Sequence, residues 1–243
     1  MSRKENNSLK AVLRNVLSNL WYSPKFGISP NASLQREFFR WYEEILVSNI
    51  KFYRLEFCGL YFELDTLDKW DMFNAFLMDT RNTKGWFWDN VISPELKNKK
   101  VFIDIGANNG IYSILSKKKY VEKVYSFELN PVSVRKFQQN LRINVNKIKT
   151  DDIRLFSFGL SDFEGNITLK VPSAGTGHST TENVLIGDYK EYVSKVKRID
   201  DISLEKADVI KIDAEGAELK IIRGGSKYLS HLNLGSKIFI TWT

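Results

Sequence analysis

The residues of this sequence best suited to chemistry are acids that follow short apolar segments. Asp104 closes an apolar run and is followed by Gly106 and Gly110, ahead of a second segment rich in apolar residues. A strand, a glycine-bearing turn and a helix are how open α/β sheets present backbone to nucleotide-like ligands. The spacing departs from G-x-G-x-x-G, because only two glycines are present and a carboxylate precedes them. Bare N–H groups suit a pyrophosphate, whereas a carboxylate suits a ligand with positive charge or hydroxyls.

A second acid, Glu128, lies 24 residues after Asp104, at the end of the next predicted strand. In a nucleotide-binding half-sheet, an acid at this spacing accepts hydrogen bonds from ribose hydroxyls, since one carboxylate can accept two donors. The alternative is a surface glutamate at a strand end, and the fingerprint spacing favours ribose binding. Asn108 has two open interpretations, a contact with the aminocarboxylate of a ligand or a cap for the following helix.

The third acidic feature is the segment Asp-Ala-Glu-Gly-Ala-Glu at residues 213–218. Asp213 closes an apolar strand, so its carboxylate should project at the strand tip, beside the first strand. Glu215 and Glu218 lie three residues apart at a predicted helix start, which would place them on one face. The helix dipole favours acids in a first turn, but this explains one acid well and three acids around a glycine poorly. S-adenosylmethionine, which carries an ammonium and a sulfonium, would suit such acids.

Strands and helices alternate regularly after residue 100. We predict strands at residues 101–105, 123–128, 154–160, 166–171, 208–213 and 237–242, and helices at residues 111–119, at 131–146 and from the acidic segment to 223. Pro131 is tolerated in a first helical turn, and Gly224 and Gly225 end the last helix. Residues 172–183 are rich in Gly, Ser and Thr and indicate a loop. Strands separated by helices predict an α/β fold with a mainly parallel, doubly wound sheet and its site at the strands' carboxyl ends.

The first 100 residues hold more than half of the aromatic residues. Helical spacing at residues 9–20, 34–50 and 68–78, and a hairpin around Gly59 at residues 52–64, are predicted there. We expect this aromatic-rich region, residues 1–100, to be a cap or substrate side for a cofactor-binding domain at residues 101–243. A membrane-surface helix is disfavoured, because basic residues are not concentrated opposite the apolar faces.

Composition excludes several classes of protein. The single cysteine, Cys58, excludes a disulfide framework, and two histidines, His178 and His231, argue against a histidine-ligated metal centre. No apolar run approaches the roughly 18 residues of a membrane span, and no signal peptide is evident, so we expect a cytoplasmic protein. The net charge of +7 comes from scattered lysines. Nucleic-acid binding is therefore disfavoured, while attraction to an acidic glycan or a membrane surface stays open.

Four motifs in order resemble those of the FkbM family of S-adenosylmethionine-dependent methyltransferases. They are Asp104-x-Gly-Ala-Asn-x-Gly110, Glu128-x-Asn130-Pro131, Gly159-Leu-Ser-Asp162 and Lys211-Ile-Asp213-Ala-Glu215-Gly216-Ala-Glu218, followed by Gly224-Gly225. The match covers residues 101–229, and the Asp-x-Glu-Gly-x-Glu element is the most specific part. The resemblance implies a class I Rossmann-like methyltransferase fold and O-methylation of a sugar, a glycan or a small metabolite.

The resemblance also implies the site residues. It places the cofactor at the first glycine turn, with Glu128 on the ribose and Ser161 and Asp162 near the adenine. The cofactor-binding set is Asp104, Gly106, Ala107, Asn108, Gly110, Glu128, Leu129, Asn130, Ser161, Asp162 and Asp213. Asp213, Glu215 and Glu218 would face the transferred methyl group.

A sugar hydroxyl is a poor nucleophile, so a positioned base should accelerate the reaction. Asp213 is the first choice for this base or for an acceptor of the substrate hydroxyl, Glu215 the second and His178 the third. Glu215, Glu218 and His178 are the candidate substrate contacts, although Glu218 is better suited to securing the loop. Asp213 and Glu215 could hold Mg²⁺, but the chemistry requires no metal.

Alternatives stay open at this point. A non-catalytic module that keeps the ligand but lost turnover is the main one; a nicotinamide-dependent oxidoreductase lacks its G-x-G-x-x-G. A nucleic-acid N-methyltransferase would carry Asn/Asp-Pro-Pro-Tyr/Phe where this chain has Asp213-Ala-Glu-Gly. A full class I sheet has seven strands and the chain ends in the fifth. We expect either a C-terminal edge shielded by the N-terminal region or a partner, or a truncated copy.

Overall fold

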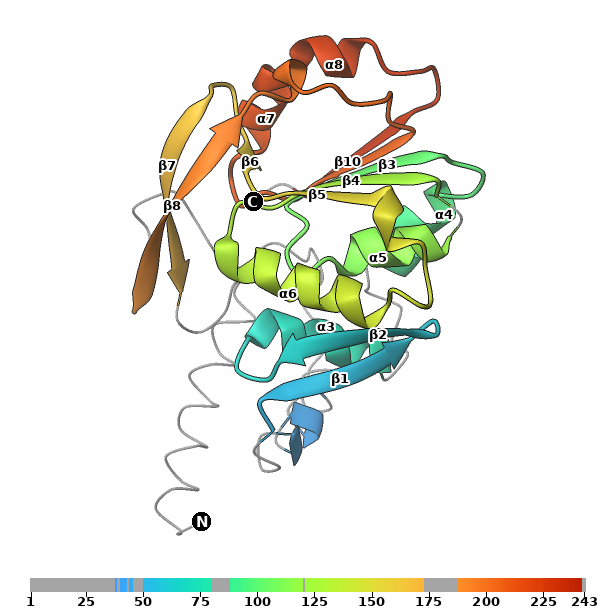
Figure 1. The fold of residues 1–243 in the computed structure, drawn as a ribbon, viewed down its shortest axis with the longest axis vertical. Helices are drawn as coiled ribbons and strands as arrows, with labels where there is room; N and C mark the ends of the chain where they lie inside the picture. Colours follow the sequence, from blue (N-terminus) through green and yellow to red (C-terminus); the bar gives the residue numbers. More distant parts are fainter. Residues whose placement is uncertain are drawn as a thin grey trace.

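The computed structural model describes residues 38, 40–42, 44–45, 50–79, 88–119, 121–172 and 188–241. Its centre is a five-stranded parallel sheet with the order β10-β9-β3-β4-β5 (Figure 1). The strands are β3 (Val101–Ile105), β4 (Lys123–Phe127), β5 (Ile153–Phe156), β9 (Val209–Ile212) and β10 (Lys237–Ile240). All residues of β3 and β9 are buried, as in parallel strands covered on both faces. The predicted class I, doubly wound α/β fold is confirmed.

Helices lie on both faces of this sheet (Figure 1). The helices α5 (Ile111–Lys118) and α6 (Pro131–Ile143) cover one face, and α7 (Glu218–Gly224) and α8 (Ser226–Ser230) cover the other. Successive residues of a strand point to opposite faces, so Phe102 joins a core with Phe137 of α6, while Ile103 joins a core with Ile221 of α7. The apolar run at residues 101–105 therefore serves two cores at once.

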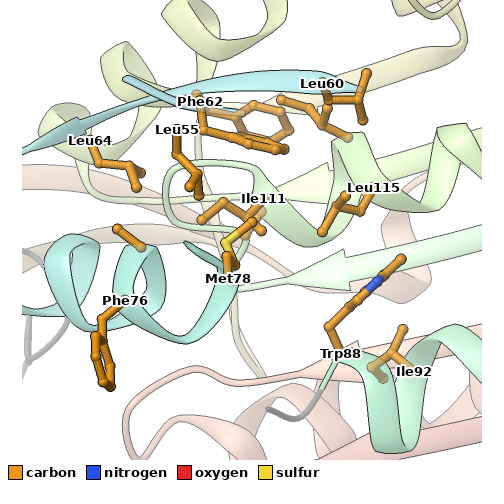
Figure 2. Close-up of a cluster of buried hydrophobic side chains, with 14 of the residues drawn as sticks. Leu55, Leu60, Phe62, Leu64, Phe76, Met78, Trp88, Ile92, Ile111 and Leu115 are labelled. Atoms are coloured by element: carbon orange, nitrogen blue, oxygen red, sulfur yellow. The ribbon is translucent and has the colours of Figure 1, made fainter. Parts of the chain in front are cut away.

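The N-terminal described elements pack onto the face covered by α5 and α6. They are β1 (Phe52–Phe57), β2 (Leu60–Asp65), α3 (Lys69–Asp79), the π-helix η3 (Trp88–Ile92) and α4 (Ser93–Glu95). The predicted hairpin is confirmed: β1 and β2 are antiparallel, and Cys58 (φ 52°) and Gly59 (φ 72°) form the two-residue turn. Figure 2 shows Phe62 of β2 and Leu115 of α5 in one buried cluster. The division of the chain at residue 100 stays a prediction, since one core spans it.

A third sheet departs from the sequence prediction. One strand was expected at residues 154–160, but β5 ends at Phe156 and the next strand, β6 (Gly159–Leu160), pairs with β8 (Tyr189–Lys197). The strand β8 also pairs antiparallel with β7 (Gly165–Pro172) and was not predicted. Only two residues of β8, Ser194 and Val196, are buried, so its sequence carries little of the apolar alternation that marks a strand.

Other boundaries differ slightly, and the described part also contains the 3₁₀ segments η4 (Thr150–Asp152) and η6 (Ile199–Asp201). The helix expected at residues 131–146 ends at Ile143, because the Asn144 side chain donates to the Tyr61 carbonyl of β2 and accepts from the Tyr61 amide. The expected helix at 9–20 lies outside the described residues, and that at 34–50 is described in part. Within the described ranges, no helix is both long and apolar enough to cross a membrane.

Candidate cofactor-binding and catalytic site

Three strand tips meet at one edge of the central sheet. In the register of the sheet, Ile105 of β3 pairs with Phe127 of β4 and with Ile212 of β9. The next residues on these strands are Gly106, Glu128 and Asp213, so the candidate residues from three sequence motifs lie side by side. The predicted juxtaposition of acidic tips is thus present.

The first glycine turn, residues 104–110, is fixed by close backbone contacts. The amides of Gly106 and Ala107 both donate to the Phe127 carbonyl, at 2.9 and 3.0 Å. A Cβ atom on Gly106 (φ +73°) would lie 1.9 Å from the Asp213 carbonyl oxygen. A Cβ atom on Gly110 (φ +83°) would lie 2.1 Å from the Phe137 ring. Both glycines are therefore required by the packing of the protein itself, whatever ligand the turn accepts.

Asp104 is a buried structural partner. Its side chain has no exposed surface, and its carboxylate accepts from the Lys211 ammonium at 3.1 Å and from the Ser113 hydroxyl at 2.7 Å. The charge of Asp104 is thus balanced inside the protein and not presented to a ligand. A direct contact with the cofactor stays a prediction; the observed contacts hold β3 to β9 and α5.

Lys211 is the residue whose role the motifs did not indicate. Its ammonium is buried, donates to the Gly106 carbonyl at 3.2 Å and lies 4.0 Å from the Asp213 carboxylate. Burial lowers the pKa of Lys211, but the charges of Asp104 and Asp213 outweigh it and hold the pKa above its ordinary value. A lysine inside the apolar strand Val209–Ile212 was the available signal, because such a cation needs a partner on the neighbouring strand.

Glu128 is held by the backbone on both sides. Its side chain is 6% exposed, and its two oxygens accept from the amides of Asn130 and Asn108, each at 2.7 Å. Burial raises the pKa of Glu128 to about 7, although these two bonds oppose the shift. A carboxylate has about four acceptor positions, so two amide bonds leave room for hydroxyl donors from a ligand.

Asp213 is in a different state. The residue's side chain is 35% exposed, yet its Oδ1 atom is buried and accepts no hydrogen bond from the described part of the chain. A buried acceptor without a donor costs about 1–3 kcal/mol. An O–H or N–H group of a ligand at the strand tip would remove that cost.

The acids after Asp213 have separate structural roles. Glu218 is buried, and its Oε1 accepts from the amides of Ala214 and Gly216, at 3.0 and 3.2 Å, closing the turn that precedes α7. The expectation that Glu215 shares a helical face with Glu218 is wrong, because Glu215 (φ 52°) has left-handed backbone and α7 begins at Glu218. Substrate contacts by Glu215 and Glu218 stay predictions.

Of the remaining candidates in the described ranges, Asn130, Leu129 and Ser161 each form a hydrogen bond in which a backbone group takes part. Asn130 is buried, and its side-chain oxygen accepts from the Val132 amide and caps α6. The Leu129 carbonyl accepts from the Ser194 hydroxyl of β8. The Ser161 amide donates to the Lys197 carbonyl of β8 at 2.8 Å. The next residue, Asp162, is half-buried. His178 lies outside the described residues.

Comparison with known proteins adds independent findings. The family model for the methyltransferase FkbM domain matches residues 104–240, more than half of the chain. Methyltransferase sdnD of Sordaria araneosa is 28% identical over 165 residues, which cover 53% of this chain and 61% of that protein. Hexuronic acid methyltransferase AglP of Haloferax volcanii is 24% identical over 142 residues, which cover 57% of this chain and 55% of that protein.

Among solved structures, the methyltransferase FkbM of Methylobacillus flagellatus matches with a TM-score of 0.41 and 22% identity, over 55% of this chain and 31% of that one. The chain spans between 55% and 61% of the length of the two curated relatives described above.

Proposed function

The chain belongs to the FkbM methyltransferase family, and from this premise we propose that it transfers a methyl group from S-adenosylmethionine to a hydroxyl of a sugar, a glycan or a small metabolite. One observation carries the proposal most strongly. Two acids at the tips of the strands on either side of β3, Glu128 and Asp213, flank the first glycine turn, and both keep acceptor capacity that the described protein does not use.

The hydrogen-bond acceptors at the strand tips suit this cofactor and its acceptor substrate. Glu128 would accept the ribose hydroxyls, with its carboxylate already oriented by the amides of Asn108 and Asn130. The unpartnered Oδ1 of Asp213 would accept the hydroxyl of the acceptor substrate. When bound, S-adenosylmethionine supplies a methyl group already activated by its sulfonium. The protein must therefore orient the reactants and remove a proton, because the leaving group needs no further activation.

We assign the removal of the substrate proton to Asp213. Its carboxylate accepts the proton of the substrate hydroxyl, and the Lys211 ammonium, 4.0 Å away, keeps that carboxylate at the strand tip. A positioned base of this kind contributes about 10²–10⁴-fold to a rate. Glu215 is the second choice for this role and His178 the third. The name of the relative from Haloferax volcanii, hexuronic acid methyltransferase, supports a sugar as the acceptor.

The test is a pair of measurements on the same preparation. Isothermal titration with S-adenosylmethionine should give saturable binding, and methyl-labelled cofactor should pass label to a hydroxyl-bearing compound in a panel of sugars and glycan extracts. Binding without transfer would favour a non-catalytic module. Absence of binding would contradict the proposal.

A further inference from the structure

The first glycine turn is held from outside the central sheet by a carboxylate of α3. Asp71 has no exposed side-chain surface, and its Oδ1 accepts from the Asn109 side chain at 2.7 Å. Asn109 belongs to the glycine turn, and its own side-chain oxygen lies 3.4 Å from the Ile111 amide at the start of α5. A residue of the N-terminal region thus reaches directly into the turn that the cofactor proposal depends on.

The Asp71–Asn109 contact lies within a wider polar connection. Asn140 of α6 donates to the Asn109 carbonyl at 2.9 Å and accepts from the Glu63 amide of β2 at 2.8 Å. The Asp65 amide donates to the second oxygen of Asp71 at 3.1 Å. The hairpin and α3 therefore bind the same turn residue by two routes, one through Asp71 and one through α6.

One cation is shared between two buried acids at this place. Lys136 of α6 donates to Asp68 at 2.6 Å and to Asp71 at 2.9 Å. Burial, together with the charge of Asp68, raises the pKa of Asp71 to about 7. Burying Asp71 is costly, and Asp68 already pairs with Lys136. What Asp71 adds is an acceptor for the Asn109 side chain and for the Asp65 amide.

Asn109 is next to the residue that contacts the ribose-binding candidate. The Asn108 amide donates to Glu128 at 2.7 Å, and Asn108 is held in left-handed backbone (φ 49°). Such a backbone persists where its neighbours fix it. Fixing Asn109 fixes Asn108, and Asn108 orients Glu128.

We propose that Asp71 is a positioning residue of the cofactor site, through which the N-terminal hairpin and α3 set the affinity for S-adenosylmethionine. This inference rests on the proposed function. It makes the region before residue 100 part of cofactor binding, in addition to any role toward the acceptor substrate. Asp71 acts through Asn109 and does not itself touch the reactants.

The test compares Asp71→Asn with the matched control Asp68→Asn. Each change removes one carboxylate from Lys136 and sets an amide NH₂ against donors, which are Lys136 and the Asp71 amide in the case of Asp68. Asp71→Asn alters in addition the acceptor of the Asn109 side chain in the glycine turn. Titration with S-adenosylmethionine should show a dissociation constant raised about tenfold for Asp71→Asn, with the turnover rate at saturating cofactor within about twofold of the parent. The control should stay within about twofold in both.

An exchange variant separates positioning from general destabilisation. In Asp71→Asn/Asn109→Asp the hydrogen bond re-forms with donor and acceptor reversed, so the dissociation constant should return to within about threefold of the parent. Equal affinity of Asp71→Asn and the parent, equal losses in Asp71→Asn and Asp68→Asn, or no recovery in the exchange variant would each overturn the inference. A parent chain that binds no cofactor would overturn the proposed function, and the inference with it.

Discussion

The two acidic strand tips beside β3 are built in opposite ways. Glu128, after β4, is 6% exposed and accepts two backbone amides. Asp213, after β9, is 35% exposed, and its buried Oδ1 atom accepts no hydrogen bond from the residues the structure describes. Both follow parallel strands that lie on either side of β3, so the difference comes from the loops around them.

The loop after each strand decides what its acid can do. After β4, the chain enters α6 within three residues, and the amide of Asn130 reaches back to Glu128. After β9, the amides of Ala214 and Gly216 donate to the Glu218 carboxylate and not to Asp213. A fixed carboxylate suits binding, and an unsatisfied one suits proton transfer. We expect the two acids to fail in different ways when changed.

Asp213→Asn should give the largest effect. Loss of the carboxylate removes the proton acceptor, so the methyl-transfer rate should fall about 10²–10⁴-fold. The dissociation constant for S-adenosylmethionine should change by less than about threefold, because Glu128 and the glycine turn are untouched. Label transfer and calorimetry on one preparation measure both quantities. Glu215→Gln serves as the control and should reduce the rate less.

Glu128→Gln should instead weaken cofactor binding and spare the transfer rate, and its effect should be smaller than that of Asp213→Asn. A hydrogen bond to a charged group contributes about 1.5–3 kcal/mol, so the dissociation constant for the cofactor should rise about 10- to 100-fold. The rate at saturating cofactor should remain within a few-fold of the parent. A variant that binds normally but turns over slowly would exchange the roles of the two acids.

The pH dependence of cofactor binding should sharpen the comparison further. Burial raises the pKa of Glu128 to about 7 in the cofactor-free chain, and hydroxyl donors favour the ionised form. Below about pH 7 the carboxylate must lose a proton to bind, so affinity should fall up to about tenfold per pH unit as pH decreases, and level off above pH 7. Calorimetry from pH 5.5 to about 8.5 measures this slope.

Glu128→Gln should flatten the slope, since an amide does not titrate in this range. Burial also raises the pKa of Asp71 to about 7, so Asp71→Asn is the necessary comparison. If the slope disappears in Asp71→Asn and persists in Glu128→Gln, the ionising group is not the strand tip.

The parts of this fold that the sequence predicted are those written in local patterns. The buried strand at residues 101–105, the hairpin turn at Gly59 and the helix that starts at Pro131 all follow from apolar periodicity and from backbone restrictions on glycine and proline. The position of Glu128 and Asp213 at one edge of the sheet, on either side of β3, followed from parallel topology, because the strands of such a sheet end at one edge.

The parts that were missed depend on long-range pairing. The Lys211–Asp104 ion pair joins residues 107 apart, and it requires the register between β3 and β9. The pairing of β6 in the third sheet depends on β8, whose exposed residues give little apolar pattern. The Asp71–Asn109 bond joins two regions that the sequence treats as separate domains. No local pattern encodes such contacts.

One calorimetric comparison tests the central claim that Glu128 binds the cofactor, whereas Asp213 removes the substrate proton and contributes little to cofactor affinity. S-adenosylmethionine is titrated into the parent chain, Glu128→Gln and Asp213→Asn under identical conditions at pH near 8, where Glu128 is ionised. We expect the Asp213→Asn isotherm to overlay that of the parent and the Glu128→Gln isotherm to be at least about tenfold weaker. Equal weakening of both variants, or weakening of Asp213→Asn alone, would contradict the division of roles.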